Sequence, residues 1–272
     1  MLSSHQKRLL TAAILLASLA VVISLGGWPL RIAVLLVSIL GLIEFFNLYW
    51  PSGIYRGRRC FGLALGGLAV LSQALDPLWT VAVLGLAFAG TGMLFLWEYG
   101  RGNTGARLGH YSPILHGLLY VPLILQLALY LTPAEQCLAL AAAIASDTGG
   151  YYAGSWFGGK KLWPLVSPKK TWAGFFGGMA ACVAVCVVMG ALSESMNWRM
   201  LQMPVWAWLL MGLALHQAAL FGDLFESALK RSLEVKDSGS LLPGHGGILD
   251  RIDSLLFVLP VFLILRQIIR FL

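Results

Sequence analysis

The acidic residues of this 272-residue chain gather in its carboxyl-terminal half, where they could hold a divalent cation. Seven of the 12 Asp and Glu residues are either Asp147 or members of the stretch 223–253. Asp223, Glu226 and Lys230 are spaced i, i+3 and i+7, so a helix places them on one face. A carboxylate at membrane depth is costly and persists mainly where it faces a cation, a cavity or a partner. The clustering therefore predicts a cation-binding site in this half of the chain.

Two further carboxylates, Asp250 and Asp253, stand three residues apart at the start of the last apolar segment. A glycine-rich loop that contains His245 separates them from the first acidic face. Oxygen ligands that converge without a His or Cys cluster suit Mg²⁺, which binds through a few carboxylates together with substrate phosphates. The alternative is that these acids only form ion pairs at helix ends, with basic partners that would be Lys230, Arg231 and Arg251.

A second polar segment combines an acid with a basic loop. Asp147 lies on the apolar helix predicted over 137–158, and the loop after that helix carries four lysines and two hydroxyls. The residues of this loop that could bind a ligand are Ser167, Lys169, Lys170 and Thr171. Cations, hydroxyls and the free N–H groups of a helix start suit a polyphosphate. The alternative is that the lysines only follow the preference for basic residues in cytoplasmic loops.

The elements that must position these groups are membrane-spanning helices. The chain is 58% apolar and only 11% charged, with a mean hydropathy of +0.79. This composition excludes an ordinary soluble domain, a disordered chain and a nucleic-acid-binding module. We predict an all-α, polytopic integral membrane bundle of about nine transmembrane helices. Their expected ranges are 9–27, 32–50, 60–75, 78–97, 114–131, 137–158, 175–192, 205–222 and 254–272.

Basic residues predict how this bundle lies in the membrane. If the amino terminus is cytoplasmic, 15 of the 19 Lys and Arg residues fall on the cytoplasmic side and 4 on the other. That asymmetry favours this topology, with both polar segments at the cytoplasmic surface. The first apolar run is expected to be retained as a span, since no cleavage site is evident. Residues 1–136 are expected to form a scaffold and lipid cavity, and residues 137–272 the catalytic region with its nucleotide site.

Three motifs resemble those of the phosphatidate cytidylyltransferase family, also called CDP-diacylglycerol synthases. The longest combines Ser227–Arg231, Lys236-Asp237, Leu242-Pro243, His245–Ile248 and Asp250–Asp253. Two upstream motifs, Ser146-Asp147-Thr148-Gly149 and Ser167-Pro168-Lys169-Lys170-Thr171, occur in the family's order. One departure is visible, because Ala173 stands where the family usually has Glu.

The resemblance implies an integral membrane enzyme that joins CTP to phosphatidate, giving CDP-diacylglycerol and pyrophosphate. It implies that Asp223 and Asp250 hold Mg²⁺, with K⁺ as a second cation of the site. We expect the catalytic residues to be Asp223, Asp250, Asp147, Lys230 and Arg231. We expect the substrate-binding residues to be Ser167, Lys169, Lys170, Thr171, Lys236, Asp237, His245, Arg251 and Asp253. Family analogy further implies a homodimer in a bacterial inner membrane, with the active site facing the cytoplasm.

Two other functions remain open at the level of sequence. A CTP-dependent lipid kinase of the polyprenol type would share an acidic, metal-bound CTP site but would transfer the γ-phosphate. A transporter would use intramembrane acids as a substrate path. Glu44, an acid near the middle of an apolar run, could line a lipid cavity or pair with a neighbouring helix.

Overall fold

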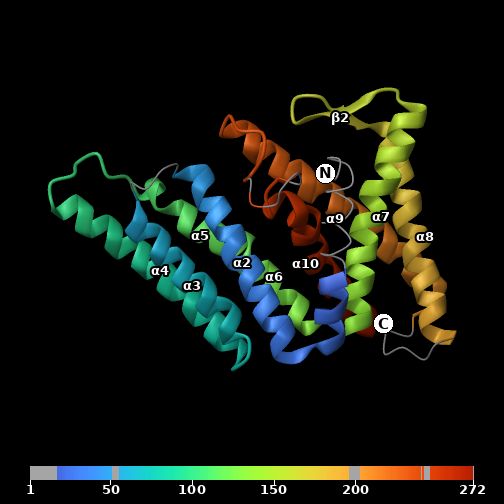
Figure 1. Ribbon diagram of the computed structural model, residues 1–272, viewed down its shortest axis with the longest axis horizontal. Coiled ribbons are helices and arrows are strands. Elements are labelled where there is room, and N and C mark those ends of the chain that lie inside the picture. Colours follow the sequence, from blue (N-terminus) through green and yellow to red (C-terminus); the bar gives the residue numbers. More distant parts are fainter. Residues whose placement is uncertain (1–16, 51–54, 196–202, 240, 242–245, 272) are drawn as a thin grey trace, which may run out of the picture. The chain divides into compact units, whose positions relative to one another are not determined.

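The computed structural model describes residues 17–50, 55–195, 203–239, 241 and 246–271, and these are mainly helical (Figure 1). The predicted all-α class is confirmed. After helical residues 17–25, the longer helices are α2 (Gly27–Tyr49), α3 (Arg56–Ser72), α4 (Pro77–Gly100), α7 (Pro133–Phe157), α8 (Trp172–Ser195), α9 (Val205–Ser232) and α10 (Leu249–Phe271). Shorter elements are η1 (Leu108–His110), α5 (Ser112–Tyr120), α6 (Pro122–Leu125), η2 (Gln126–Tyr130), β1 (Lys161–Trp163) and β2 (Ser167–Thr171).

Six helical segments in the described part of the chain are long and apolar enough to cross a membrane. They are Gly27–Tyr49, Pro77–Gly100, Ser112–Tyr130, Trp172–Ser193, Val205–Ser232 and Leu249–Arg270. Two of the nine predicted spans, 60–75 and 137–158, correspond to the helices α3 and α7, which are not among these six segments. Helix α3 has only 17 residues, and the interior of α7 contains Asp147 and several glycines, which lower its hydropathy. Residues 9–16 of the predicted span 9–27 lie outside the described residues, and residues 17–25 are helical.

The chain packs as two units. One contains residues 1–126 together with 237–249, and the other contains residues 127–236 together with 250–272. The division by packing thus falls at 126/127, and the loop before α10 packs with the amino-terminal unit. The functional division expected at 136/137 stays a prediction.

The first unit is built around the second half of α2. Leu42 and Phe46 are fully buried there. The Phe46 ring lies against Gly62 of α3, where a Cβ would be only 2.6 Å from the ring, and Leu42 lies closer still to Gly66. Gly117 of α5 approaches both side chains. Small residues let the backbones of membrane helices come close enough to pack without a hydrophobic driving force.

A buried arginine joins α3 to α4 in the same unit. Arg58 forms a two-pronged ion pair with Glu98, with its Nη2 2.7 Å from Oε1 and 2.6 Å from Oε2. The rings of Tyr55 and Tyr111 lie 4.3 Å and 4.0 Å from its guanidinium carbon, measured to the ring centroids. The charge is therefore compensated by a carboxylate and by two aromatic faces, which makes its burial tolerable.

The second unit is centred on a close pair, α7 and α8, which run side by side in Figure 1. A Cβ on Gly177 of α8 would lie 2.9 Å from the carbonyl oxygen of Gly149 in α7. Gly150 and Gly154 face Gly174 in the same seam. Since no side chain fits between the two backbones here, the glycines set the distance between the helices.

We expect Gly177→Ala to destabilise the protein by about 2 kcal/mol, because the added methyl group must push α7 and α8 apart. Thermal unfolding in detergent measures the change. Gly92→Ala is the matched control, since a Cβ there would meet nothing within 4 Å. Equal melting temperatures for the two variants would contradict the packing described above.

Arg266 in the last helix is also paired. Its Nε lies 3.0 Å from Oε1 of Glu135 in the first turn of α7, and its Nη1 donates to the carbonyl of Tyr130 at 2.9 Å. Both charged side chains are buried. With a cytoplasmic amino terminus and nine spans, the last helix ends on the extracytoplasmic side, where an arginine is uncommon. The ion pair explains its presence independently of topology.

Candidate active site

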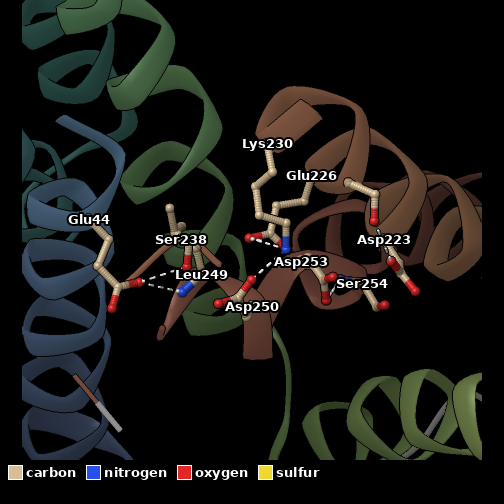
Figure 2. A network of polar contacts seen from close by, with 10 residues as sticks. Glu44, Asp223, Glu226, Lys230, Ser238, Leu249, Asp250, Asp253 and Ser254 are labelled. Atoms are coloured by element: carbon tan, nitrogen blue, oxygen red, sulfur yellow. Dashed lines mark hydrogen bonds and ion pairs between the residues drawn. The ribbon is translucent and has the colours of Figure 1, made fainter. Parts of the chain in front are cut away.

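Four elements of the second unit bring charged side chains together: α7, β2, α9 and the first turns of α10. The members of this cluster, which we call the acidic cluster, are Asp147, Asp223, Glu226, Asp250 and Asp253, with Lys170 and Lys230 among them. Figure 2 shows the α9 and α10 members close together.

The segment predicted as a basic loop folds as a hairpin. Strands β1 and β2 pair antiparallel, with Lys161 opposite Thr171 and Trp163 opposite Ser167. Thr171 is buried, and its hydroxyl accepts the Gly174 N–H at 3.0 Å, which ties the hairpin to the start of α8. The hairpin therefore holds the backbone of Lys169 and Lys170 in a fixed position, which an irregular loop would not do.

Lys170 reaches from this hairpin to α9. Its Nζ lies 2.8 Å from Oδ2 of Asp223, and both side chains are partly exposed. Asp223 also accepts a hydrogen bond from the hydroxyl of Ser227, one turn later, at 3.2 Å. The two polar segments inferred from the sequence thus meet at this ion pair.

Lys230 links the two acidic helices. Its Nζ lies 2.5 Å from Oδ1 of Asp250 in α10 and 3.4 Å from Oε1 of Glu226 in its own helix. Glu226 is completely buried, whereas the Asp250 and Lys230 side chains are 11% and 14% exposed. One ammonium therefore serves two carboxylates, and it joins α9 to the first turn of α10 (Figure 2).

Asp253 and Asp147 complete the cluster. Asp253 accepts the N–H of Ser254 at 2.6 Å and interacts electrostatically with Asp223 and Glu226. The Ser254 hydroxyl in turn donates to Oδ2 of Asp147 in α7 at 3.4 Å. The helices can meet because Gly222 of α9 lies against the Asp253–Ser254 backbone, where a Cβ would collide.

The balance of charge in the cluster fits a bound cation. Five carboxylates face two ammonium groups, and neighbouring carboxylates away from bulk water repel each other unless a proton or a cation lies between them. Within the described residues, no three His, Cys, Asp or Glu side chains converge closely enough to hold a metal ion by themselves. Mg²⁺ does not require such a group, since one or two carboxylates and substrate phosphates suffice.

Other predicted site residues lie around the cluster. Lys169 is exposed and Ser167 half-buried, both on β2. Arg231, Lys236, Asp237 and Arg251 are exposed. His245 lies outside the described residues. Their predicted roles remain predictions.

Some residues of the site could not be assigned to it from the sequence alone. Glu226 and Ser254 stand at helical spacing from Asp223 and Asp250, but an i, i+4 ion pair with Lys230 explains Glu226 equally well. His216 is buried within α9, and its Nδ1 lies 2.9 Å from the Ser146 hydroxyl, directly beside Asp147. A lone histidine in an apolar segment was the only sign of this polar link.

An apolar depression adjoins the cluster. It has a volume of about 330 Å³ and is open on one side. Its lining comes from the hairpin, α9 and α10: Trp163, Val166, Phe221, Leu224, Phe225, Ala228 and Phe257. Phe221 and Phe225 stand on either side of Asp223 in the sequence, so apolar and charged surfaces of α9 meet here.

The fold and the cluster define a helical membrane protein with a charged site suited to phosphate chemistry. A profile of the cytidylyltransferase family matches residues 6–269, which is nearly the whole chain. The chain belongs to the cytidylyltransferase family.

Individual relatives agree with this assignment. A phosphatidate cytidylyltransferase of Staphylococcus haemolyticus is 30% identical over 286 residues, covering 95% of this chain and 97% of that protein. The enzyme of the same name from Staphylococcus epidermidis is 48% identical over 120 residues, and that from Bacillus subtilis 46% over 116 residues. These two matches span 44% and 41% of the relatives' own lengths.

Proposed function

We propose that this protein transfers the cytidylyl group of CTP to phosphatidate, giving CDP-diacylglycerol and pyrophosphate. The observation that carries the proposal is the acidic cluster, in which carboxylates of α7, α9 and α10 surround lysines of β2 and α9. Family membership and the names of the relatives support the same reaction.

In the proposed reaction a phosphate oxygen of phosphatidate attacks the α-phosphorus of CTP. The bond from that phosphorus to the oxygen bridging to the β-phosphate breaks, and pyrophosphate leaves with the bonding electrons. A phosphate monoester is already anionic near neutral pH, so no strong general base is required. The protein's task is to position two anions and to offset their charge.

Asp223 and Asp250 would hold Mg²⁺, which when bound would offset negative charge on the triphosphate and the leaving pyrophosphate. A monovalent cation such as K⁺ is proposed to share the site. Lys170 and Lys230 lie beside these two aspartates, so their ammonium groups are placed to contact phosphate oxygens. Five carboxylates would otherwise repel a triphosphate, which is why the proposal requires a cation.

The apolar depression beside the cluster supports a lipid substrate. Its wall of Phe221, Phe225 and Phe257 would let acyl chains remain in an apolar environment while the phosphate reaches Lys170 or Lys230. We propose that the site faces the cytoplasm of a bacterial inner membrane, since the basic residues fall mainly on that side. A homodimer is proposed from family analogy alone.

Labelled CTP tests the proposed reaction in detergent-purified protein. Label on the α-phosphorus should enter the lipid, and pyrophosphate should appear only when CTP, phosphatidate and Mg²⁺ are all present. Transfer of γ-label to lipid would instead identify a lipid kinase. Failure to release pyrophosphate under any of these conditions would contradict the proposal.

Lys170→Met is expected to raise the KM for CTP about 10-fold, because it removes one charge-assisted contact to phosphate, worth about 1.4 kcal/mol. Steady-state kinetics with varied CTP measure this change. Asp76→Asn is a suitable control for altered charge, because Asp76 is exposed and lies at the start of α4. An unchanged KM in Lys170→Met would remove Lys170 from the nucleotide site.

A further inference from the structure

A buried acid of α2 holds the loop that precedes α10. Glu44 is 3% exposed, and its Oε2 accepts two hydrogen bonds: from the Leu249 N–H at 2.9 Å and from the Ser238 hydroxyl at 3.2 Å (Figure 2). Leu249 is the first residue of α10, and the first N–H groups of a helix have no partner within it. The carboxylate supplies an acceptor there and places negative charge at the positive end of the helix.

Two glycines let the loop approach this carboxylate. A Cβ on Gly239 would lie 2.6 Å from Oε1 of Glu44, and a Cβ on Gly247 would lie 2.5 Å from Oε2. Separations below 3.0 Å essentially never occur for real Cβ atoms. Any other residue at either position would displace the loop from Glu44, so the two glycines and the acid form one structural arrangement.

This arrangement offsets the unfavourable free energy of burying the Glu44 carboxylate. A carboxylate inside an apolar helix is unfavourable unless donors satisfy it. The donors here come from residues roughly 200 positions later in the chain, all in the segment 237–249 that packs with the first unit. Glu44 therefore specifies where both ends of this loop lie.

We propose that Glu44 is a positioning residue for cytidylyl transfer: by holding Ser238 and Leu249 it fixes the residues next to them in the chain, Asp237 and Asp250. The inference rests on the proposed function, in which Asp237 binds substrate and Asp250 holds Mg²⁺. Asp250, a proposed metal ligand, follows Leu249 directly in the chain. Glu44 itself is placed to contact the loop, and it acts on the reaction through that loop.

The test compares Glu44→Ala with Glu44→Gln, using two measurements on the full-length protein in detergent. Hydrogen exchange of peptides covering 246–250 should be at least about 10-fold faster in Glu44→Ala, because the Leu249 N–H loses its acceptor. The kcat/KM with CTP and phosphatidate should fall about 100-fold, the scale of a small misplacement of binding groups. Glu44→Gln should restore a large part of both values, since its amide oxygen still accepts the N–H.

Ser38→Ala is the matched control, because it removes another buried polar group from α2, six residues or about 9 Å along the helix from Glu44. It should exchange and react as the wild type does. If Glu44→Ala does not fold, Ser238→Ala, which removes one of the two donors to Glu44, takes its place and should show smaller changes in the same direction. Wild-type exchange at 246–250 in Glu44→Ala or its replacement, or faster exchange there with unchanged kcat/KM, would overturn the proposal.

The two measurements separate this inference from the reaction on which it rests. A wild-type protein that does not act on CTP and phosphatidate would refute the proposed function. The exchange experiment would still report whether Glu44 holds the loop, because it needs no substrate.

Discussion

Asp250→Asn and Asp223→Asn should each lower the rate of CTP-dependent pyrophosphate release by about 1,000-fold or more. Each substitution keeps the size of the side chain and removes the negative charge proposed to bind Mg²⁺. The two aspartates contact different lysines, Lys230 and Lys170, so neither can replace the other. The rates are measured with saturating CTP, phosphatidate and Mg²⁺.

The folded state of these variants is checked by thermal unfolding and by gel filtration in detergent. Glu234→Gln is the matched control, because it neutralises an exposed acid from the same acidic stretch of sequence. That variant should retain its activity. Near-normal turnover in either aspartate variant would remove that residue from the metal site.

Lys230→Met should lower both activity and stability. The substitution leaves Glu226 and Asp250 without their shared ammonium, and an uncompensated buried charge costs about 3 kcal/mol. The free energy of unfolding in detergent measures the stability. Turnover should fall as well, because Lys230 is also proposed to contact substrate phosphate.

The double variant Lys230→Met/Glu226→Gln separates these two effects. Neutralising Glu226, which is completely buried, should recover part of the lost stability, whereas turnover should stay low. A single variant as stable as the wild type would show that the ion pairs seen around Lys230 contribute little. Full recovery of turnover in the double variant would show that Lys230 has only a structural role.

Helical period and hydropathy were sufficient to predict the helical membrane fold, since each segment of apolar residues must satisfy its backbone hydrogen bonds internally. They were also sufficient to place Asp223 and Lys230 on one face of α9. The hairpin β1–β2 was predicted as a loop, because its residues are too few and too polar to show a strand pattern. The hairpin packs against α7, α8 and α9, and a local sequence pattern does not record such tertiary contacts.

Partners across long sequence distances could not be predicted. Glu44 has no neighbouring donor in the sequence, and its contacts with Ser238 and Leu249 appear only once the chain has folded. The link from Ser146 to His216 is of the same kind, since both residues stand alone in apolar segments. Local patterns report helix faces, whereas the pairing of faces depends on packing that no local pattern records.

The most direct measurement is electron paramagnetic resonance of Mn²⁺, used in place of Mg²⁺, with purified protein and CTP. The wild type should bind Mn²⁺ tightly in the presence of CTP, and Asp223→Asn and Asp250→Asn should each weaken this binding strongly. Glu234→Gln should bind as the wild type does. Undiminished CTP-dependent Mn²⁺ binding in both aspartate variants would contradict a cation held between α9 and α10.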